Sequence, residues 1–348
     1  MALNSSGPIS LAGTTAGVSI EIENGGNGTT TISLNDTAVR TLAGVPSGAI
    51  TMPTNFYGKA NRVTLSYTYS ANTANASLTV TSISGYSAGK SDITVTVNSG
   101  VYLYSTSTGN AGLTLVGGNT GDTVTLVNNG YIMGQGGNGT SAPSAGSAGG
   151  PAISLGFNTT INNTNASAYI GGGGGGGAGN LSYASGGGGG AGGGSGGGSY
   201  AGSGGGIGSS GGNGSYNVYI CGCGVTEAGP GGGGGGRIFP GSGGAGGYGN
   251  QIYMYGQYWP GPGSGGGAGG GGAMGGGNNS NRGGDGGSGS SAGGGGSGNI
   301  AQPGGGGGWG ASGGGSYGNA AGGNAVSLNG KTVTWTSGNT TRVYGAVS

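Results

Sequence analysis

Runs of glycine recur through the second half of the chain and constrain its fold more than any other feature. The first lies in "IGGGGGGGAGN" (170–180), and others follow at 186–198, 202–212, 230–236, 241–247, 263–277, 283–298 and 304–315. Such composition is usual for flexible linkers. Here, however, mostly Ala and Ser replace Gly inside the runs, aromatic residues lie between them, and alternating sequence resumes afterwards. Since disordered segments are poor in aromatics, the sequence favours an ordered glycine-rich domain.

Packed helices of the polyproline-II type are the alternative to a flexible coil. Such a helix has about 3 residues per turn and no internal hydrogen bonds, so its N–H and C=O groups must pair with neighbouring helices once buried. Collagen is excluded, because Ala191 and Ser195 do not follow a strict triplet period. Ordering glycine costs more backbone entropy than ordering any other residue. We therefore predict a sandwich of polyglycine-II helices held by many cooperative inter-helix hydrogen bonds.

Composition and charge exclude several classes of protein. With 106 glycines in 348 residues and 4% charged residues, a conventional apolar core cannot run through the whole chain. Eight basic and seven acidic residues without a basic cluster argue against nucleic acid as a partner. The apolar runs are far shorter than the ~20 residues that span a bilayer, which argues against membrane insertion. The N-terminus lacks the pattern of a secretory signal, so we expect synthesis in the cytoplasm of the producing cell.

Hydrophobic alternation and glycine content divide the chain into four segments. They predict a mainly β fold with a non-classical glycine-rich domain. Residues 1–60 are expected to form a small module of strands plus one short helix. Residues 61–160 contain short alternating stretches such as "RVTLSYTY", "DITVTV" and "DTVTLVNNG", which predict an all-β domain, either a sandwich or a solenoid. The glycine-rich region is 161–322. Residues 323–348 return to strand texture and are expected to pack on the β-domain.

Two local patterns lie in the first segment. In "GVSIEIENG", alternation of Val18, Ile20 and Ile22 with polar residues predicts a half-buried strand whose solvated side carries Glu21 and Glu23.

In "ISLNDTAVRTLAG", a short helix is expected. Asn35 or Asp36 caps its start, Val39 and Leu42 form its apolar side, and Gly44 ends it.

Several stretches resemble bacteriophage tail proteins. "ISLNDTAVRTLAGVPSGAITMPTNFYGK" resembles the N-terminal virion-attachment module of many tail-fibre and tail-tip proteins. The glycine-rich region, with "SDITVTVNSGVYLYS", "GDTVTLVNNGYIMGQGGNG" and "VTWTSGNTTRVYGAVS", resembles phage receptor-binding proteins and the tail-fibre tip adhesins of T-even-type phages. That resemblance implies a polyglycine-II sandwich whose variable loops recognise the bacterial surface. The T-even-type adhesin sits on a separate fibre protein, whereas this chain carries its own attachment module, so the oligomeric state, including a homo-trimer, stays open.

The resemblance also implies partners and a location. Residues 1–60 would bind other tail or baseplate proteins, and the loops would bind a host polysaccharide or outer-membrane protein, in a protein located in the virion. If the glycine runs alternate up and down, the turns at 180–185, 213–229, 248–262 and 299–303 lie at the far end of the sandwich, and those at 199–201, 237–240 and 278–282 lie near the β-domain. Aromatic residues offer large, rigid contact area. The predicted receptor-binding residues are Tyr183, Tyr216, Tyr219, Tyr248, Tyr253, Tyr255, Tyr258 and Trp259. The alternative is that some of them, Tyr183 and Tyr219 above all, only cover the ends of the sandwich.

Catalytic and metal-binding patterns are scarce. The sequence has no histidine, and Cys221 and Cys223 alone cannot hold a structural metal, so they are expected to be small residues of a tight loop. The alternative is a strained disulfide between them, formed after release from the cell. A glycosidase pair such as Asp92 and Asp122 is conceivable only in principle. We expect neither enzymatic activity nor a cofactor or metal. Besides a receptor-binding protein, the sequence leaves open a purely structural fibre or cap protein of the virion and, more remotely, an ice-binding protein built from glycine helices.

Overall fold

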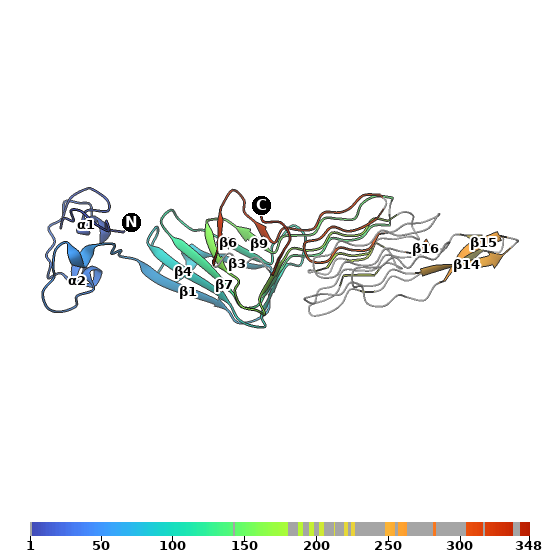
Figure 1. The fold of residues 1–348 in the computed structure, drawn as a ribbon, viewed down its shortest axis with the longest axis horizontal. Helices are drawn as coiled ribbons and strands as arrows, with labels where there is room; N and C mark the ends of the chain where they lie inside the picture. The colour runs from blue at the N-terminus through green and yellow to red at the C-terminus, as the bar shows by residue number, and fades with distance from the viewer. Residues whose placement is uncertain are drawn as a thin grey trace. The chain divides into compact units, whose positions relative to one another are not determined.

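The computed structural model describes residues 2–141, 143–179, 187–190, 195–197, 202–204, 212, 304–315, 317–336 and 342–348, and the backbone of strands at 219–221, 224–226, 248–254, 257–262 and 281–282 (Figure 1). The chain divides into two compact units. The first comprises Met1–Tyr67, Val80–Thr94 and Gly117–Val124, and the second comprises Thr68–Thr79, Val95–Val116 and Thr125–Ser348. The fold is mainly β with few helices, as the alternating sequence predicts.

The N-terminal part of the first unit packs short helices around a small apolar core. It contains α1 (Ile20–Glu23), α2 (Thr37–Ala43) and the 3-10 helix η1 (Thr54–Phe56). The core side chains are Leu3, Ile20, Val39, Leu42, Ala43 and Phe56. Strand structure between residues 2 and 62 is limited to a single bridge between Ser10 and Ser19. The prediction of several strands and one helix is therefore wrong, because this part of the chain is formed by short helices and loops.

Helix α1 replaces the half-buried strand expected at Ile20 and Ile22. Ser19 caps it, with its hydroxyl accepting a hydrogen bond from the Ile22 N–H at 3.3 Å. Glu21 and Glu23 are 2% and 3% exposed rather than solvated. The Glu21 carboxylate accepts the backbone N–H groups of Asn27 and Gly28 in the loop that follows the helix, and the Glu23 carboxylate accepts that of Asn61, 38 residues along the chain. The alternation is too short to distinguish a strand from one helical turn, and these tertiary hydrogen bonds account for the buried carboxylates.

Helix α2 confirms the second local pattern. Its N-cap residue is Asp36, although the Asp36 carboxylate makes no hydrogen bond to the first turn and accepts the preceding Ser33 N–H at 2.7 Å instead. Its C-cap is Gly44 in the left-handed conformation, with φ of 71°. Val39 and Leu42 are buried in the core, as predicted.

Three sheets share the strands of residues 63–171 and of the C-terminus. In spatial order, the first is β1 (Val63–Tyr69), β4 (Ser91–Val97), β7 (Thr123–Asn128), β10 (Thr159–Asn162) and β18 (Val333–Trp335). The second is β19 (Val343–Tyr344), β11 (Tyr169–Gly171), β8 (Tyr131–Met133), β5 (Tyr102–Tyr104) and β2 (Thr73–Ala74), and the third is β17 (Val326–Ser327), β9 (Ile153–Leu155), β6 (Leu113–Val116) and β3 (Ala76–Thr79). A second 3-10 helix, η2 (Val80–Ser82), follows β3.

The arrangement of these strands is that of a parallel β-helix. Neighbouring strands of the second and third sheets run parallel, as do β7, β10 and β18 of the first. Each pass of the chain visits the sheets in turn, so strands adjacent in space come from successive passes. The alternation predicted from sequence is confirmed, for example in β4, where Ile93, Val95 and Val97 are buried between half-buried polar residues. The open choice between sandwich and solenoid is thereby decided in favour of a solenoid.

The C-terminal strands occupy the last positions of the same sheets. Val333 pairs with Thr159, Val343 with Ile170, and Val326 with Ile153. A turn at "NG" (329–330) connects β17 to β18, with positive φ at Asn329 and Gly330. The glycine-rich sequence between β11 and β17 is therefore an insertion into the β-helix, and a shorter one, 134–152, lies between β8 and β9.

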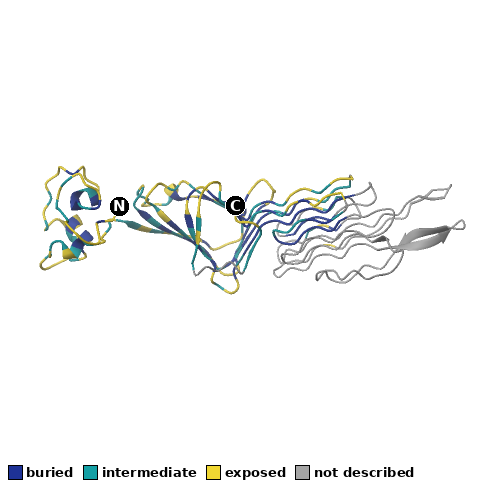
Figure 2. Cartoon of the chain, turned by 45° about the horizontal axis from the view of Figure 1, so that its top comes forward, coloured by how far each residue is buried: buried dark blue, intermediate teal, exposed yellow. Residues whose placement is uncertain are grey.

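The described glycine segments run side by side and are largely buried (Figures 1 and 2). Their backbone hydrogen bonds recur at every third residue. The N–H groups of Gly134, Gly137 and Thr140 donate to the carbonyls of Gly171, Gly174 and Gly177. Gly172 donates to the Tyr344 carbonyl, and the N–H donors of 173–178 alternate among three other segments. The N–H groups of Gly173 and Gly176 reach 147–150, those of Gly174 and Gly177 reach 187–190, and those of Gly175 and Ala178 reach 311–314.

No side chain fits on this segment because backbone surrounds it. A Cβ on any residue from Gly172 to Gly177 would lie 1.8–2.1 Å from a carbonyl oxygen of a neighbouring segment. Real Cβ atoms never approach a carbonyl so closely, so glycine is required by close approach on every side. Backbones this close also bring Cα–H groups against carbonyls, a secondary attraction.

Candidate binding site

A hairpin carries most of the aromatic residues predicted to bind a receptor. Strand β14 (Tyr248–Met254) pairs antiparallel with β15 (Gln257–Pro262), and residues 255 and 256 connect them. The register sets Tyr253 opposite Tyr258 and Ile252 opposite Trp259. The hairpin therefore concentrates aromatic positions within a short stretch of paired backbone.

A third strand, β16 (Asn281–Arg282), joins this hairpin and corrects one expectation. Asn281 pairs with Gly249, and Arg282 pairs with Tyr248. The up–down scheme assigns 248–262 and 278–282 to opposite ends of the glycine-rich domain. Because their backbones are paired, these two turns do not lie at opposite ends.

A second, separate hairpin contains one of the two cysteines. Strand β12 (Tyr219–Cys221) pairs with β13 (Gly224–Thr226), and Cys221 lies opposite Gly224. Cys223 lies outside the described residues. Only two residues separate the paired positions, which agrees with the tight loop expected there.

Five of the eight predicted receptor-binding residues lie in described strands, in two separate sheets. Tyr248, Tyr253, Tyr258 and Trp259 share one sheet, and Tyr219 belongs to the separate hairpin. Tyr183, Tyr216 and Tyr255 lie outside the described residues. The structure thus brings together the positions between 248 and 262.

A row of tyrosines on the second sheet of the β-helix was not predicted from sequence. Tyr102, Tyr131 and Tyr169 occupy equivalent positions on β5, β8 and β11. The rings of Tyr102 and Tyr131 stack with centroids 4.5 Å apart, and those of Tyr131 and Tyr169 with centroids 5.8 Å apart. All three are half-buried, and burial raises the pKa of the Tyr131 hydroxyl. Since the ring faces cover one another, the row stabilises the stacking of successive turns.

The next row on the same sheet holds the contact between the β-helix and the glycine segments. Tyr104, Met133 and Gly171 follow one another, and Tyr344 pairs with Gly171. A Cβ on Gly171 would lie 1.9 Å from the Trp309 ring, which packs there at 1% exposure. The missing side chain at Gly171 therefore makes the space that Trp309 fills.

A repeated local pattern could have revealed both rows. "YLY" (102–104), "YIM" (131–133) and "YIG" (169–171) place Tyr, a buried aliphatic residue and a third residue in the same order. Because the spacing between these triplets is irregular, the repeat is hard to see without the strand register.

The two carboxylates considered as a glycosidase pair are both held by neighbours in the first unit. Asp92 accepts from Arg62 Nε at 2.8 Å, and chiefly this bond lowers the pKa of Asp92. Burial opposes ionisation of Asp122, but hydrogen bonds from the Tyr86 hydroxyl and from the backbone leave its pKa lowered. A glycosidase general acid needs a raised pKa, whereas the pKa of each of these carboxyls is lowered.

The described residues carry neither a metal-binding cluster nor a membrane-spanning helix. No group of three or more His, Cys, Asp or Glu side chains in the described part of the chain is arranged to hold a metal ion. Among the residues that the structure describes, no helix has the length and apolar character required to cross a membrane.

No protein-family model and no curated protein matches the chain. Among solved structures, it is similar to the crystal structure of the gp37–gp38 adhesin tip complex of the bacteriophage S16 long tail fiber. The likeness covers 97% of this chain and 100% of the other, at 17% sequence identity and a TM-score of 0.43. A TM-score this low does not establish a common fold.

Proposed function

We propose that the protein is a non-enzymatic receptor-binding protein of a bacteriophage tail that recognises the bacterial surface through aromatic loops of its glycine-rich domain. The hairpin of β14 and β15 is the observation that carries this proposal. It gathers Tyr248, Tyr253, Tyr258 and Trp259 onto paired strands, in a region where most of the remaining residues are Gly, Ala and Ser. Rigid aromatic residues on a rigid support give contact area at low entropic cost.

The rigid support in this proposal is a polyglycine-II sandwich. Two observations favour it, namely hydrogen bonding at every third residue and the close approach of backbone on every side of 172–177. Three residues per turn is the period of this helix type. In addition, none of Gly172 to Gly177 has a positive φ. This agrees with a left-handed helix of the polyproline-II type, in which φ is negative at every residue.

The proposed position of the recognition loops, at the end of the sandwich away from the β-helix, is supported by chain direction. Gly171 belongs to β11, and residue 178 is about 22 Å further along a helix that rises ~3.1 Å per residue. The next described segment runs back, because Gly174 and Gly177 donate to Gly190 and Gly187 in reverse order. The last run also returns toward the β-helix, with Gly304 opposite Ala178 and Gly310 opposite Gly172.

Attachment to the virion completes the proposal. Residues 1–60 would bind another tail or baseplate protein, as their resemblance to attachment modules implies. Their core of buried apolar side chains, together with the hydrogen-bonded Glu21 and Glu23, supports a module with a defined surface.

The test is to replace residues 248–262 by a Gly/Ser linker of equal length in the phage. We expect particles of normal composition that no longer adsorb to the host. A matched variant, Tyr317→Ser, removes an exposed aromatic outside the hairpin and should adsorb normally. Unchanged adsorption of the 248–262 variant would contradict the proposal. Failure of particle assembly would instead favour a structural fibre or cap protein.

A further inference from the structure

A line of hydroxyl groups crosses the third sheet of the β-helix. The register aligns Ser77 on β3 with Thr114 on β6, Thr114 with Ser154 on β9, and Ser154 with Ser327 on β17. All four are half-buried or exposed, whereas their neighbours Leu78, Leu113, Leu115, Ile153 and Val326 are buried inside. The line therefore lies on the outer surface of the sheet.

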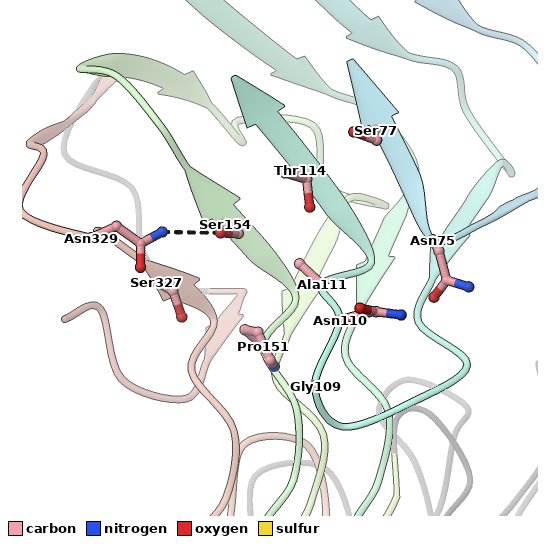
Figure 3. A pocket seen from close by; sticks show the side chains of 10 residues that line it. All are labelled: Asn75, Ser77, Gly109, Asn110, Ala111, Thr114, Pro151, Ser154, Ser327 and Asn329. Carbon is pink, nitrogen blue, oxygen red and sulfur yellow. Dashed lines mark hydrogen bonds between the residues drawn. The ribbon is translucent and has the colours of Figure 1, made fainter. Parts of the chain in front are cut away.

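This line is the floor of a recess rather than part of a flat face. Asn75, Asn110 and Pro151 border it at one side, and Asn329 borders it at another (Figure 3). The cavity measures about 480 Å³. With strands about 4.8 Å apart, four aligned residues extend over ~14 Å, so the recess is long enough for several small rings in a row.

Its polar groups are only partly used by the protein. The Ser154 hydroxyl accepts from Asn329 Nδ2 at 3.0 Å, and the Ser327 hydroxyl accepts from Asn324 Nδ2 at 3.3 Å. The side chains of Ser77, Thr114 and Asn110 make no hydrogen bond to any described residue. Hydroxyl and amide groups can each donate and accept, so the recess offers both functions along its length.

The lining excludes several classes of ligand. It contains no charged side chain, which disfavours anions, cations and nucleic acid, and no aromatic or large aliphatic side chain, which disfavours a protein anchor. A neutral molecule that presents many hydroxyl groups in sequence matches both the polarity and the length. We propose that this recess, formed by Ser77, Thr114, Ser154, Ser327, Asn110 and Asn329, binds a neutral oligosaccharide. The site is independent of the aromatic hairpin proposed above.

The experiment measures binding of maltotriose, cellotriose and chitotriose to the full-length protein by saturation-transfer NMR and calorimetry. We expect at least one of them to bind with millimolar affinity. The double variant Thr114→Val/Ser154→Ala should weaken that binding by about tenfold or more, because two hydroxyls are lost while shape is kept. Asn110→Ala, on an exposed loop, provides a second and structurally mild test.

A matched control is Thr125→Val on the first sheet, where Thr125 is half-buried in the same way as Thr114. It should leave binding unchanged, and all variants should unfold at the wild-type temperature. The proposal is overturned if no trisaccharide binds at 10 mM (a concentration on the order of the expected dissociation constants), if the double variant and Asn110→Ala bind as wild type does, or if Thr125→Val loses binding equally. Because the hairpin replacement should leave trisaccharide binding intact, failure of this site and failure of the receptor-binding role are distinguishable.

Discussion

The β-helix and the glycine segments order their backbones in opposite ways. In the β-helix, hydrogen bonds join each strand to neighbours within one sheet, and buried side chains such as Leu103, Ile132 and Ile170 fill the interior. In the glycine segments, hydrogen bonds leave one segment in several directions, and backbone itself fills the interior. One region therefore depends on what side chains add, and the other depends on their absence.

The difference teaches that burial alone does not define a core. Gly172 to Gly177 are as buried as Ile132, yet they carry no apolar side chain. Their stability must come from many backbone hydrogen bonds, each with a modest net contribution of about 0.5–1.5 kcal/mol. Removing side-chain volume should harm the β-helix, and adding volume should harm the glycine segments.

The largest effect is expected where the two regions meet. Trp309→Ala removes the ring that fills the space over Gly171 and should lower the free energy of unfolding by about 3–5 kcal/mol. Gly171→Ala should also destabilise, because the ring can no longer pack there. Denaturant unfolding of both single variants and the double variant measures the coupling. If the loss of unfolding free energy in the double variant equals the sum of the losses in the two single variants, Gly171 and Trp309 are not coupled and this contact does not join the two regions.

A core truncation tests the β-helix side of the comparison. Leu103→Ala, at a fully buried position, should cost about 2–5 kcal/mol through lost burial and a cavity. Thr334→Ala, at an exposed position of β18, is the control and should change stability by less than ~0.5 kcal/mol. Equal effects of the two changes in thermal unfolding would contradict a side-chain core.

The reverse substitution tests the glycine side. Gly175→Ala would set a Cβ 2.1 Å from the Ala320 carbonyl oxygen, so the segments must separate, at a cost of about 1–3 kcal/mol. Gly109→Ala adds the same atom where no other atom lies within 4 Å, and it should be nearly neutral. Hydrogen exchange of the 172–178 amides should report the difference, and equal protection in both variants would argue against close packing of backbone.

The smallest effect concerns pH and the first unit. The hydrogen bond from Arg62 holds the pKa of Asp92 below its ordinary value. A lowered folded-state pKa stabilises the protein above the unfolded-state pKa of about 3.9, and this stabilisation is lost as pH falls through the folded value. Because the Asp92 side chain is 38% exposed, solvent screening limits the contribution to less than ~1 kcal/mol. Asp92→Asn should flatten the stability profile below pH ~4, and an unchanged acid limb would show that this pair is not responsible.

Sequence patterns predicted local structure well where interactions between residues close in sequence determine it. The cap and end of α2 at Asp36 and Gly44, and the alternation of β4, follow from backbone and burial preferences of neighbouring residues. The pattern failed at α1, where Glu21 and Glu23 are buried and hydrogen-bonded, Glu21 to Asn27 in the loop that follows and Glu23 to Asn61 far along the chain. Of the candidate site, sequence identified the aromatic positions from 248 to 262, but not the pairing of β14 with β16.

By itself, the sequence predicted that the glycine runs are organised by backbone rather than by side chains, and the described segment 172–177 agrees with that prediction. It also determined which strand residues turn inward, through their period of two. Only the tertiary structure decided which strands are neighbours, that Trp309 fills the space left at Gly171, and that four hydroxyls from successive turns form one line. Alternation of apolar and polar residues predicts which side chains are buried. The register between strands far apart in sequence depends on how those strands pair in the folded chain.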